Sequence, residues 1–77
     1  MTAQKLIDQL KKLDPKAEVL VASDEEGNGF GKLVDVTPNM FYTEEDGNIE
    51  EVVDAEDKKE LEEDGVSGFK KAIILWP

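Results

Sequence analysis

The feature that most constrains the fold is an unbroken apolar run near the end of the chain, AIILW at residues 72–76. A strand with apolar side chains on both faces belongs in the interior of a sheet, because neither face can meet water. We therefore predict that segment 69–77 is a central strand. Segment 17–23 contains four consecutive apolar residues rich in valine. It is expected to be a second central strand, paired with the first.

The first residues have the pattern of an amphipathic helix over 3–13. Thr2 can cap this helix through its hydroxyl. Asp14-Pro15 ends it, because proline disfavours helical geometry in the residue before it. The apolar residues form one stripe at helical spacing, and they are Leu6, Ile7, Leu10 and Leu13. We expect this helix to pack on one face of the sheet.

Turn signals divide the middle of the chain into shorter strands. Segment 30–37 is predicted to be a strand, and Pro38 suits the second position of a type I turn. The strand is expected to resume at MFYT. A second turn signal at 45–48 precedes 49–53, which we expect to be a short edge strand. The predicted fold is a single α+β two-layer domain over residues 1–77, with a mainly antiparallel sheet of four to five strands.

The charge is concentrated in one segment. The chain carries 9 cationic residues, all lysine, and 19 acids, for a net charge of −10. Residues 44–64 hold twelve of the acids and two of the lysines, so this segment alone accounts for the excess. Within it, Asp54 can cap a second helix over 55–63, and Gly65 offers a left-handed end. This helix has few apolar residues and is expected on the surface.

The acidic segment excludes some partners and suggests others. Direct nucleic-acid binding is not expected, because phosphate affinity needs a cationic footprint. If the second helix presents its carboxylates on one face, they could imitate DNA phosphates and occupy the DNA groove of a host protein. The alternative is a solvated surface that aids solubility. The candidate acidic-face residues are Glu56, Asp57, Glu60, Glu63 and Asp64.

The stretch ASDEEGNGFGKL, residues 22–33, is a second candidate site. Its three glycines let another molecule approach the backbone closely. The candidate ligand-binding or partner-binding residues are Ser23, Asp24, Glu26, Gly27, Asn28 and Phe30. A calcium loop fits only in part, because Asp35 stands where a glutamate is needed and strands flank the loop. No metal is predicted, and a turn with solvated acids is the alternative.

The composition argues against catalysis. The chain has no cysteine, histidine or arginine, so the commonest general base, metal ligand and thiolate nucleophile are missing. Neither Ser23 nor Ser67 has a plausible base. We predict a non-enzymatic protein without a cofactor. No apolar run reaches the roughly 18 residues of a membrane span, and no signal-peptide pattern is present, so we expect a cytoplasmic protein.

The order of these motifs resembles a known group of proteins. LIDQLKKLDPKAEVLVASDEEGN at the start and AIILWP at the end are similar to small proteins encoded by tailed bacteriophages and prophages, mostly of unassigned function. The similarity spans nearly the whole chain, including the Ser-Asp-x-Glu-Gly-Asn loop, a variable acidic middle and the terminal Leu-Trp-Pro. The resemblance implies an accessory protein in the cytoplasm of an infected bacterial host. It implies no activity.

These observations predict a protein that acts by binding. Our first hypothesis is a protein-binding module that inhibits a host protein, such as a defence protein, through the acidic face, the 23–30 loop or both. The alternative is a small-ligand or nucleotide-sequestering protein that uses the 23–30 loop. A third reading is a structural virion component. The partners that stay open are a host protein, a small molecule and a second copy of the chain.

Overall fold

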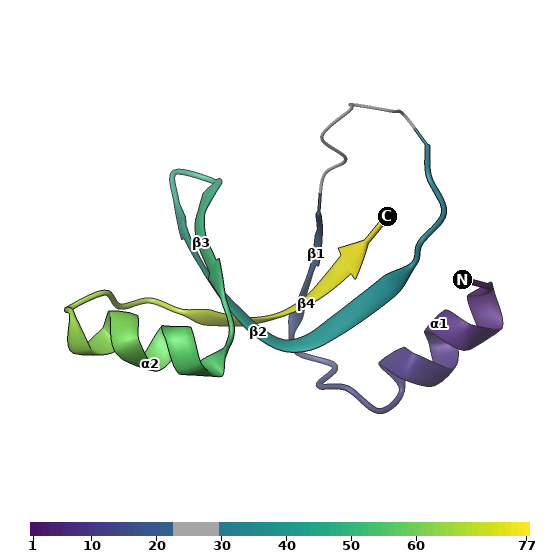
Figure 1. Cartoon of the computed structure of the whole chain (residues 1–77), viewed down its shortest axis with the longest axis horizontal. Coiled ribbons are helices and arrows are strands. Elements are labelled where there is room, and N and C mark those ends of the chain that lie inside the picture. The colour runs from purple at the N-terminus through teal and green to yellow at the C-terminus, as the bar shows by residue number, and fades with distance from the viewer. Residues whose placement is uncertain (23–29) are drawn as a thin grey trace.

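The computed structural model describes residues 1–22 and 30–77. These residues form two helices and four strands, which Figure 1 colours from purple to yellow along the chain. The strands make one mixed sheet in the order β1-β4-β2-β3, with β1 and β4 parallel and the other pairs antiparallel. The predicted α+β fold class is confirmed. The elements are α1 (Ala3–Leu10), β1 (Glu18–Val21), β2 (Asp35–Glu45), β3 (Asn48–Val53), α2 (Ala55–Glu63) and β4 (Lys70–Trp76).

Strand β4 lies in the interior of the sheet, between β1 and β2. Its residues Ala72, Ile73 and Ile74 are buried. Strand β1 runs parallel to it, with Glu18 opposite Ala72. Both the central position predicted for the last apolar run and its pairing with the first apolar run are confirmed.

Strand β1 lies at an edge of the sheet, so its predicted central position is wrong. In the part of the chain that the structure describes, it pairs only with β4, and Val19 and Val21 are 47% and 74% exposed. Leu20 and Ala22 are the residues that pack against the core. The prediction failed because a short apolar run does not reveal how many strands flank it. Ser23, its predicted last residue, lies outside the described residues.

Strand β2 begins at Asp35, not at the predicted residue 30, and it continues through the segment that was predicted to be a turn, so both predictions are wrong. The register against β4 shifts between Thr37 and Met40, which leaves Pro38 and Asn39 in a β-bulge. Asn39 has a φ of 60°. A proline without an N–H and an asparagine in the left-handed region suit a bulge as well as a turn. Figure 1 shows the result, which is a bent strand and not a chain reversal.

Helix α1 begins as predicted and ends early. The Thr2 hydroxyl accepts a backbone N–H at 3.3 Å and caps the helix. The helix ends at Leu10 and not at the predicted Leu13, because the chain tightens into shorter-range bonds such as Leu13 N–H to Leu10 carbonyl, at 3.1 Å. The Met1 amino group donates to the Leu33 carbonyl at 2.7 Å, which ties the start of α1 to the segment before β2.

The acidic segment 44–64 adopts the predicted local structure. Asp46 and Gly47 have φ values of 52° and 82°, as in the two-residue turn that joins hairpin strands. Strand β3 is the predicted edge strand. The Asp54 carboxylate caps α2 by accepting a backbone N–H at 2.8 Å, and Gly65, with φ 95°, follows its end. These predictions are confirmed.

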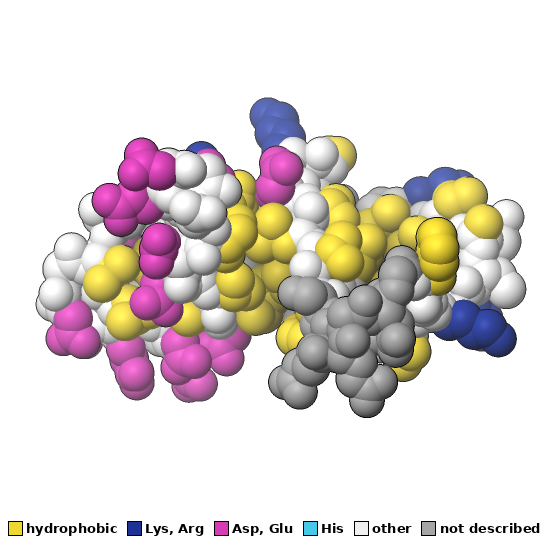
Figure 2. All heavy atoms as spheres, turned by 90° about the horizontal axis from the view of Figure 1, so that it is seen from above, with side chains coloured by type: hydrophobic (Ala, Val, Ile, Leu, Met, Phe, Trp, Pro, Cys, Tyr) yellow, Lys and Arg dark blue, Asp and Glu magenta, His cyan; other side chains and the backbone are white. Residues whose placement is uncertain are grey.

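The core is small and apolar. Its buried residues are Val36, Tyr42, Ala72, Ile73 and Ile74. Tyr42, Ala72 and Ile74 form one cluster, against which Leu20, Ala22 and Met40 pack. Among the described residues, none that is polar or charged is buried. Figure 2 shows an apolar band in the middle of one face, with most of the acidic side chains gathered at one end. The fold therefore separates its apolar centre from its acidic end.

Candidate functional site

The 23–30 loop falls almost wholly outside the described residues. Phe30 is described, and its side chain is 101% exposed, so it takes no part in the core. A binding role for this loop stays a prediction. The predicted site residues that lie outside the described part are Ser23, Asp24, Glu26, Gly27 and Asn28.

Helix α2 brings the five predicted acidic residues to one side. At about 100° per residue, they fall within an arc of about 120° around the helix axis. By the same measure, Lys58 and Glu62 lie on the opposite side of the helix, and half-buried Leu61 lies beside the arc. The carboxylates of the arc are all exposed, which meets the condition that the hypothesis of an acidic face set. They belong to Glu56, Asp57, Glu60, Glu63 and Asp64.

Lys58 connects this helix to the sheet. Its Nζ lies 2.9 Å from a Glu62 carboxylate oxygen and 5.0 Å from the centroid of the Phe41 ring in β2. The second contact is a cation–π interaction between the helix and the sheet. Because Lys58 faces the sheet, the acidic arc on the other side of α2 faces solvent.

The β2–β3 hairpin extends the acidic surface beyond the residues that sequence reasoning singled out. Figure 2 shows that acidic side chains gather over α2 and this hairpin. One of them is paired, because Lys70 Nζ lies 2.8 Å from Glu44 Oε1. The hydrogen bond to Glu44, and then its charge, raise the pKa of Lys70 above its ordinary value. The exposed hairpin acids are Glu44, Glu45, Asp46, Glu50 and Glu51.

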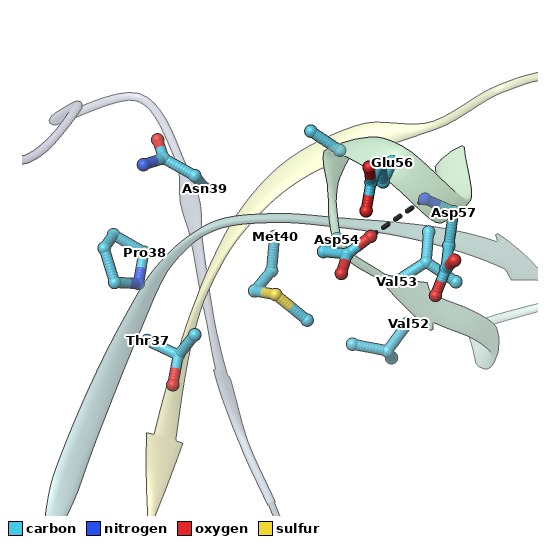
Figure 3. Close-up of a pocket in the computed structure, with 10 residues that line it drawn as sticks. Thr37, Pro38, Asn39, Met40, Val52, Val53, Asp54, Glu56 and Asp57 are labelled. Atoms are coloured by element: carbon cyan, nitrogen blue, oxygen red, sulfur yellow. Dashed lines mark hydrogen bonds between the residues drawn. The ribbon is translucent and has the colours of Figure 1, made fainter. Parts of the chain in front are cut away.

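An open hollow of about 620 Å³ lies where β3 ends and α2 begins (Figure 3). Strand β3 pairs with β2 only over Phe41–Glu45, whereas β2 begins at Asp35. Among the described residues, the bent first half of β2 therefore has no strand beside it on this edge. Figure 3 shows Met40 lying between the bulge and Val52 of β3. The mismatch in strand length creates the hollow.

The hollow has an apolar floor and a carboxylate rim, and we call it the acidic hollow. Its floor includes Val52, which is 45% exposed. Among its lining residues, we call Met40, Val52 and Val53 the floor and Asp54, Glu56 and Asp57 the rim; the others are Thr37, Pro38, Asn39 and Ala55. Such an arrangement can hold a group that is apolar along its length and cationic at its end. Sequence reasoning named Glu56 and Asp57 but missed the floor, for which the only signal was the shortness of segment 49–53.

Comparisons of this chain with protein-family models, with curated proteins and with solved structures find no match. Its function has to be inferred from its own residues. In residues 1–22 and 30–77, no helix is long and apolar enough to cross a membrane. In the same two ranges, no group of three or more acidic side chains is placed to hold a metal ion.

Proposed function

We propose that this protein acts without catalysis, by binding a basic segment of another protein at the acidic hollow. The observation that carries the proposal is the apolar floor of Met40 and Val52 beside the carboxylates of Glu56 and Asp57. Lysine and arginine combine an aliphatic stem with a cationic head. One such side chain can cover the floor with its stem and meet the rim with its charge.

The charge around the hollow supports a cationic partner. The segment 44–64 carries the whole net charge of −10. The electrostatic field of a surface with charges of one sign attracts oppositely charged surfaces and speeds their association with it. Single exposed ion pairs add little affinity, because solvent screens them. We therefore expect the charges to select the partner and the apolar floor to supply much of the binding energy.

The shape of the hollow supports a protein partner over a small molecule. Small-molecule sites are concave and usually bury most of the ligand surface. The acidic hollow is open to solvent and bounded on one side by the free edge of β2. Such a surface suits a side chain that projects from a second protein.

We further propose that the partner is a host protein and that the chain is a phage-type accessory protein. The support is the resemblance of its motif order to small phage proteins, together with its acidic surface. A DNA-binding host protein, such as a defence protein, has the basic groove that such a surface fits. A pure DNA mimic would need only the acidic arc of α2, whereas binding at the acidic hollow also needs the apolar floor.

The test is a pull-down of the tagged protein from bacterial lysate at low and high salt, with bound proteins and released small molecules identified by mass spectrometry. We expect capture of a basic protein that weakens as salt rises, because screening shortens the reach of charge. Glu56→Gln with Asp57→Asn should lose the partner, and so should Val52→Lys. The control, Glu50→Gln with Glu51→Gln, removes the same charge from the hairpin and should retain it.

The outcomes separate the alternatives. Equal loss in both charge variants, with Val52→Lys retained, would favour a diffuse DNA mimic over the hollow. Capture of a partner that depends neither on the salt concentration nor on these substitutions would contradict the proposal. A released small molecule would move the function to the 23–30 loop, and recovery only with phage particles would indicate a virion component.

A further inference from the structure

The sheet has three open edges in its described part, and they are not equally protected. Strand β3 carries Glu50 and Glu51 on its edge. The free part of β2 is interrupted by Pro38 and the bulge at Asn39. Charges, prolines and bulges are the usual devices that keep a sheet edge from pairing with another chain. Strand β1 has no proline and only one charged residue, Glu18, within Glu18–Val21, and its register against β4 is regular.

The outer side of β1 offers both backbone groups and apolar side chains. The Ala22 N–H donates to the Leu75 carbonyl of β4 at 2.9 Å. Because backbone groups alternate in direction along a strand, those of Val19 and Val21 point away from β4. The same two valines are among the exposed large apolar residues of the chain. The edge is therefore competent to accept another strand.

The charge distribution indicates which strand it accepts. Residues 1–22 contain four lysines and three acids and are followed by three more acids at 24–26, whereas residues 44–64 alone carry −10. The acidic segment includes β3, at the opposite edge of the sheet from β1. Two copies of this chain repel each other less when they approach through β1 than through β3, since the segment that carries −10 includes the opposite edge of the sheet.

We propose that β1 pairs antiparallel with β1 of a second copy, centred on Leu20, so that the two sheets join edge to edge. In this register, Val19 of each copy lies opposite Val21 of the other copy. The two copies therefore share two hydrogen-bonded valine pairs. Glu18 then lies opposite Ala22. A register centred on Val19 would instead set the Glu18 carboxylate against Leu20. Of these two registers, only the one centred on Leu20 pairs the exposed valines of the two copies with each other.

The dimer is expected to be weak and to depend on salt. A strand of four residues buries much less than the roughly 1,600 Å² of a standard interface. Its association should strengthen as salt rises, because salt screens the repulsion between two chains of charge −10. Binding at the acidic hollow has the opposite salt dependence, so either proposal can fail without the other.

Sedimentation equilibrium over a wide range of protein concentration tests the dimer at low and high salt. The unaltered chain should shift from monomer to dimer as concentration rises, and more so at high salt. Val19→Lys should stay monomeric under all these conditions. The matched control is Ile49→Lys on β3, because Ile49 is 46% exposed and Val19 is 47% exposed, and this variant should still dimerise. A monomeric unaltered chain, or equal loss in both variants, would overturn the proposal.

The register has its own test, because the chain contains no cysteine. In a Leu20-centred pairing, Leu20 faces its copy in a non-hydrogen-bonded pair with Cα atoms about 4.5 Å apart, which is within disulfide reach. Leu20→Cys should therefore form a disulfide-linked dimer on mild oxidation. In the unaltered chain, the Val19 and Val21 amides should exchange hydrogen more slowly as concentration rises. If these amides exchange at the same rate in the monomer and the dimer, the proposed pairing is wrong, whatever the cysteine variant does.

Discussion

Strand β4 and helix α2 are elements of similar length with opposite roles. Strand β4 contributes three buried residues to the core, whereas no residue of α2 is buried. Helix α2 is held by the Asp54 cap and by the contacts of Lys58. The fold therefore depends on β4, whereas the outer side of α2 carries charges that the core does not require. That separation leaves the acidic surface available for binding.

The largest effect on stability is expected from a substitution that places a charge in the buried part of β4. Ile74 is 3% exposed and packs with Tyr42 and Ala72. Removing such a side chain costs about 2–5 kcal/mol, and a buried carboxylate costs more. A domain of this size has little stability to lose. Ile74→Asp should therefore unfold the protein, as measured by circular dichroism and by the dispersion of its NMR spectrum.

The matched change in α2 is Leu61→Asp. Leu61 is only half-buried, so this variant should remain folded with a lowered melting temperature. A cooperative transition of Ile74→Asp near that of the unaltered chain would show that β4 is not the structural centre. Unfolding of both variants would show that α2 is as essential as β4.

A smaller effect is expected from the α2 cap. Asp54→Ala removes the acceptor of the 2.8 Å capping bond, which costs about 1 kcal/mol. For a domain of this length, that corresponds to a melting temperature lower by about 4–8 °C. Differential scanning calorimetry can measure the shift. Asp64→Ala, at the other end of α2, removes the same charge but keeps the C-cap bonds, which the Asp64 backbone N–H donates, and it should not lower the melting temperature.

The two ends of α2 should respond oppositely to loss of charge. Glu56 lies in the first turn, where the positive end of the helix dipole favours an acid, and Glu63 lies in the last turn, where the dipole disfavours one. Glu56→Gln should destabilise the protein by about 0.3–1 kcal/mol, and Glu63→Gln should stabilise it by a similar amount. Denaturant unfolding at low salt measures both. Shifts of the same sign would mean that general charge repulsion outweighs the dipole.

The smallest effect on stability is expected from the exposed ion pair between Lys70 in β4 and Glu44 in the β2–β3 hairpin. Glu44 raises the pKa of Lys70, so the stability that this pair contributes is present below the ordinary lysine pKa and is lost as pH rises through the raised value. Glu44→Gln should lower the pKa of Lys70, as followed by NMR titration of its side chain. Glu45→Gln removes the same charge from the neighbouring residue and should lower it less. Equal shifts would mean that the 2.8 Å contact has no special effect.

The parts of the fold that depend on neighbouring residues could be predicted from the sequence. The Asp54 cap, the Asp46-Gly47 turn and the Gly65 helix end all follow from short-range backbone chemistry. The central place of AIILW also followed, because five consecutive apolar residues need cover on both faces.

The parts that depend on distant partners could not be predicted. Pro38 and Asn39 were expected to reverse the chain, but pairing of β2 with β4 on both sides of them turns the same residues into a bulge. Strand β1 was expected in the interior because it is apolar, but an apolar run does not show how many strands lie beside it. Of the candidate sites, the acidic arc was predictable from helical spacing. The floor of the acidic hollow was not, because Met40 and Val52 meet only through the pairing of β2 with β3.

The position of β4 along the chain has a consequence for how the protein is made. Strand β4 follows all the other described elements, yet it separates β1 from β2 in the sheet. During synthesis, β1 and the β2–β3 hairpin leave the ribosome before the strand that joins them exists. Pairing of Glu18 with Ala72 spans most of the chain, and such long-range contacts form slowly. The sheet is therefore expected to form only after β4 has been synthesised, and a chain interrupted before β4 would expose unpaired strands to its neighbours.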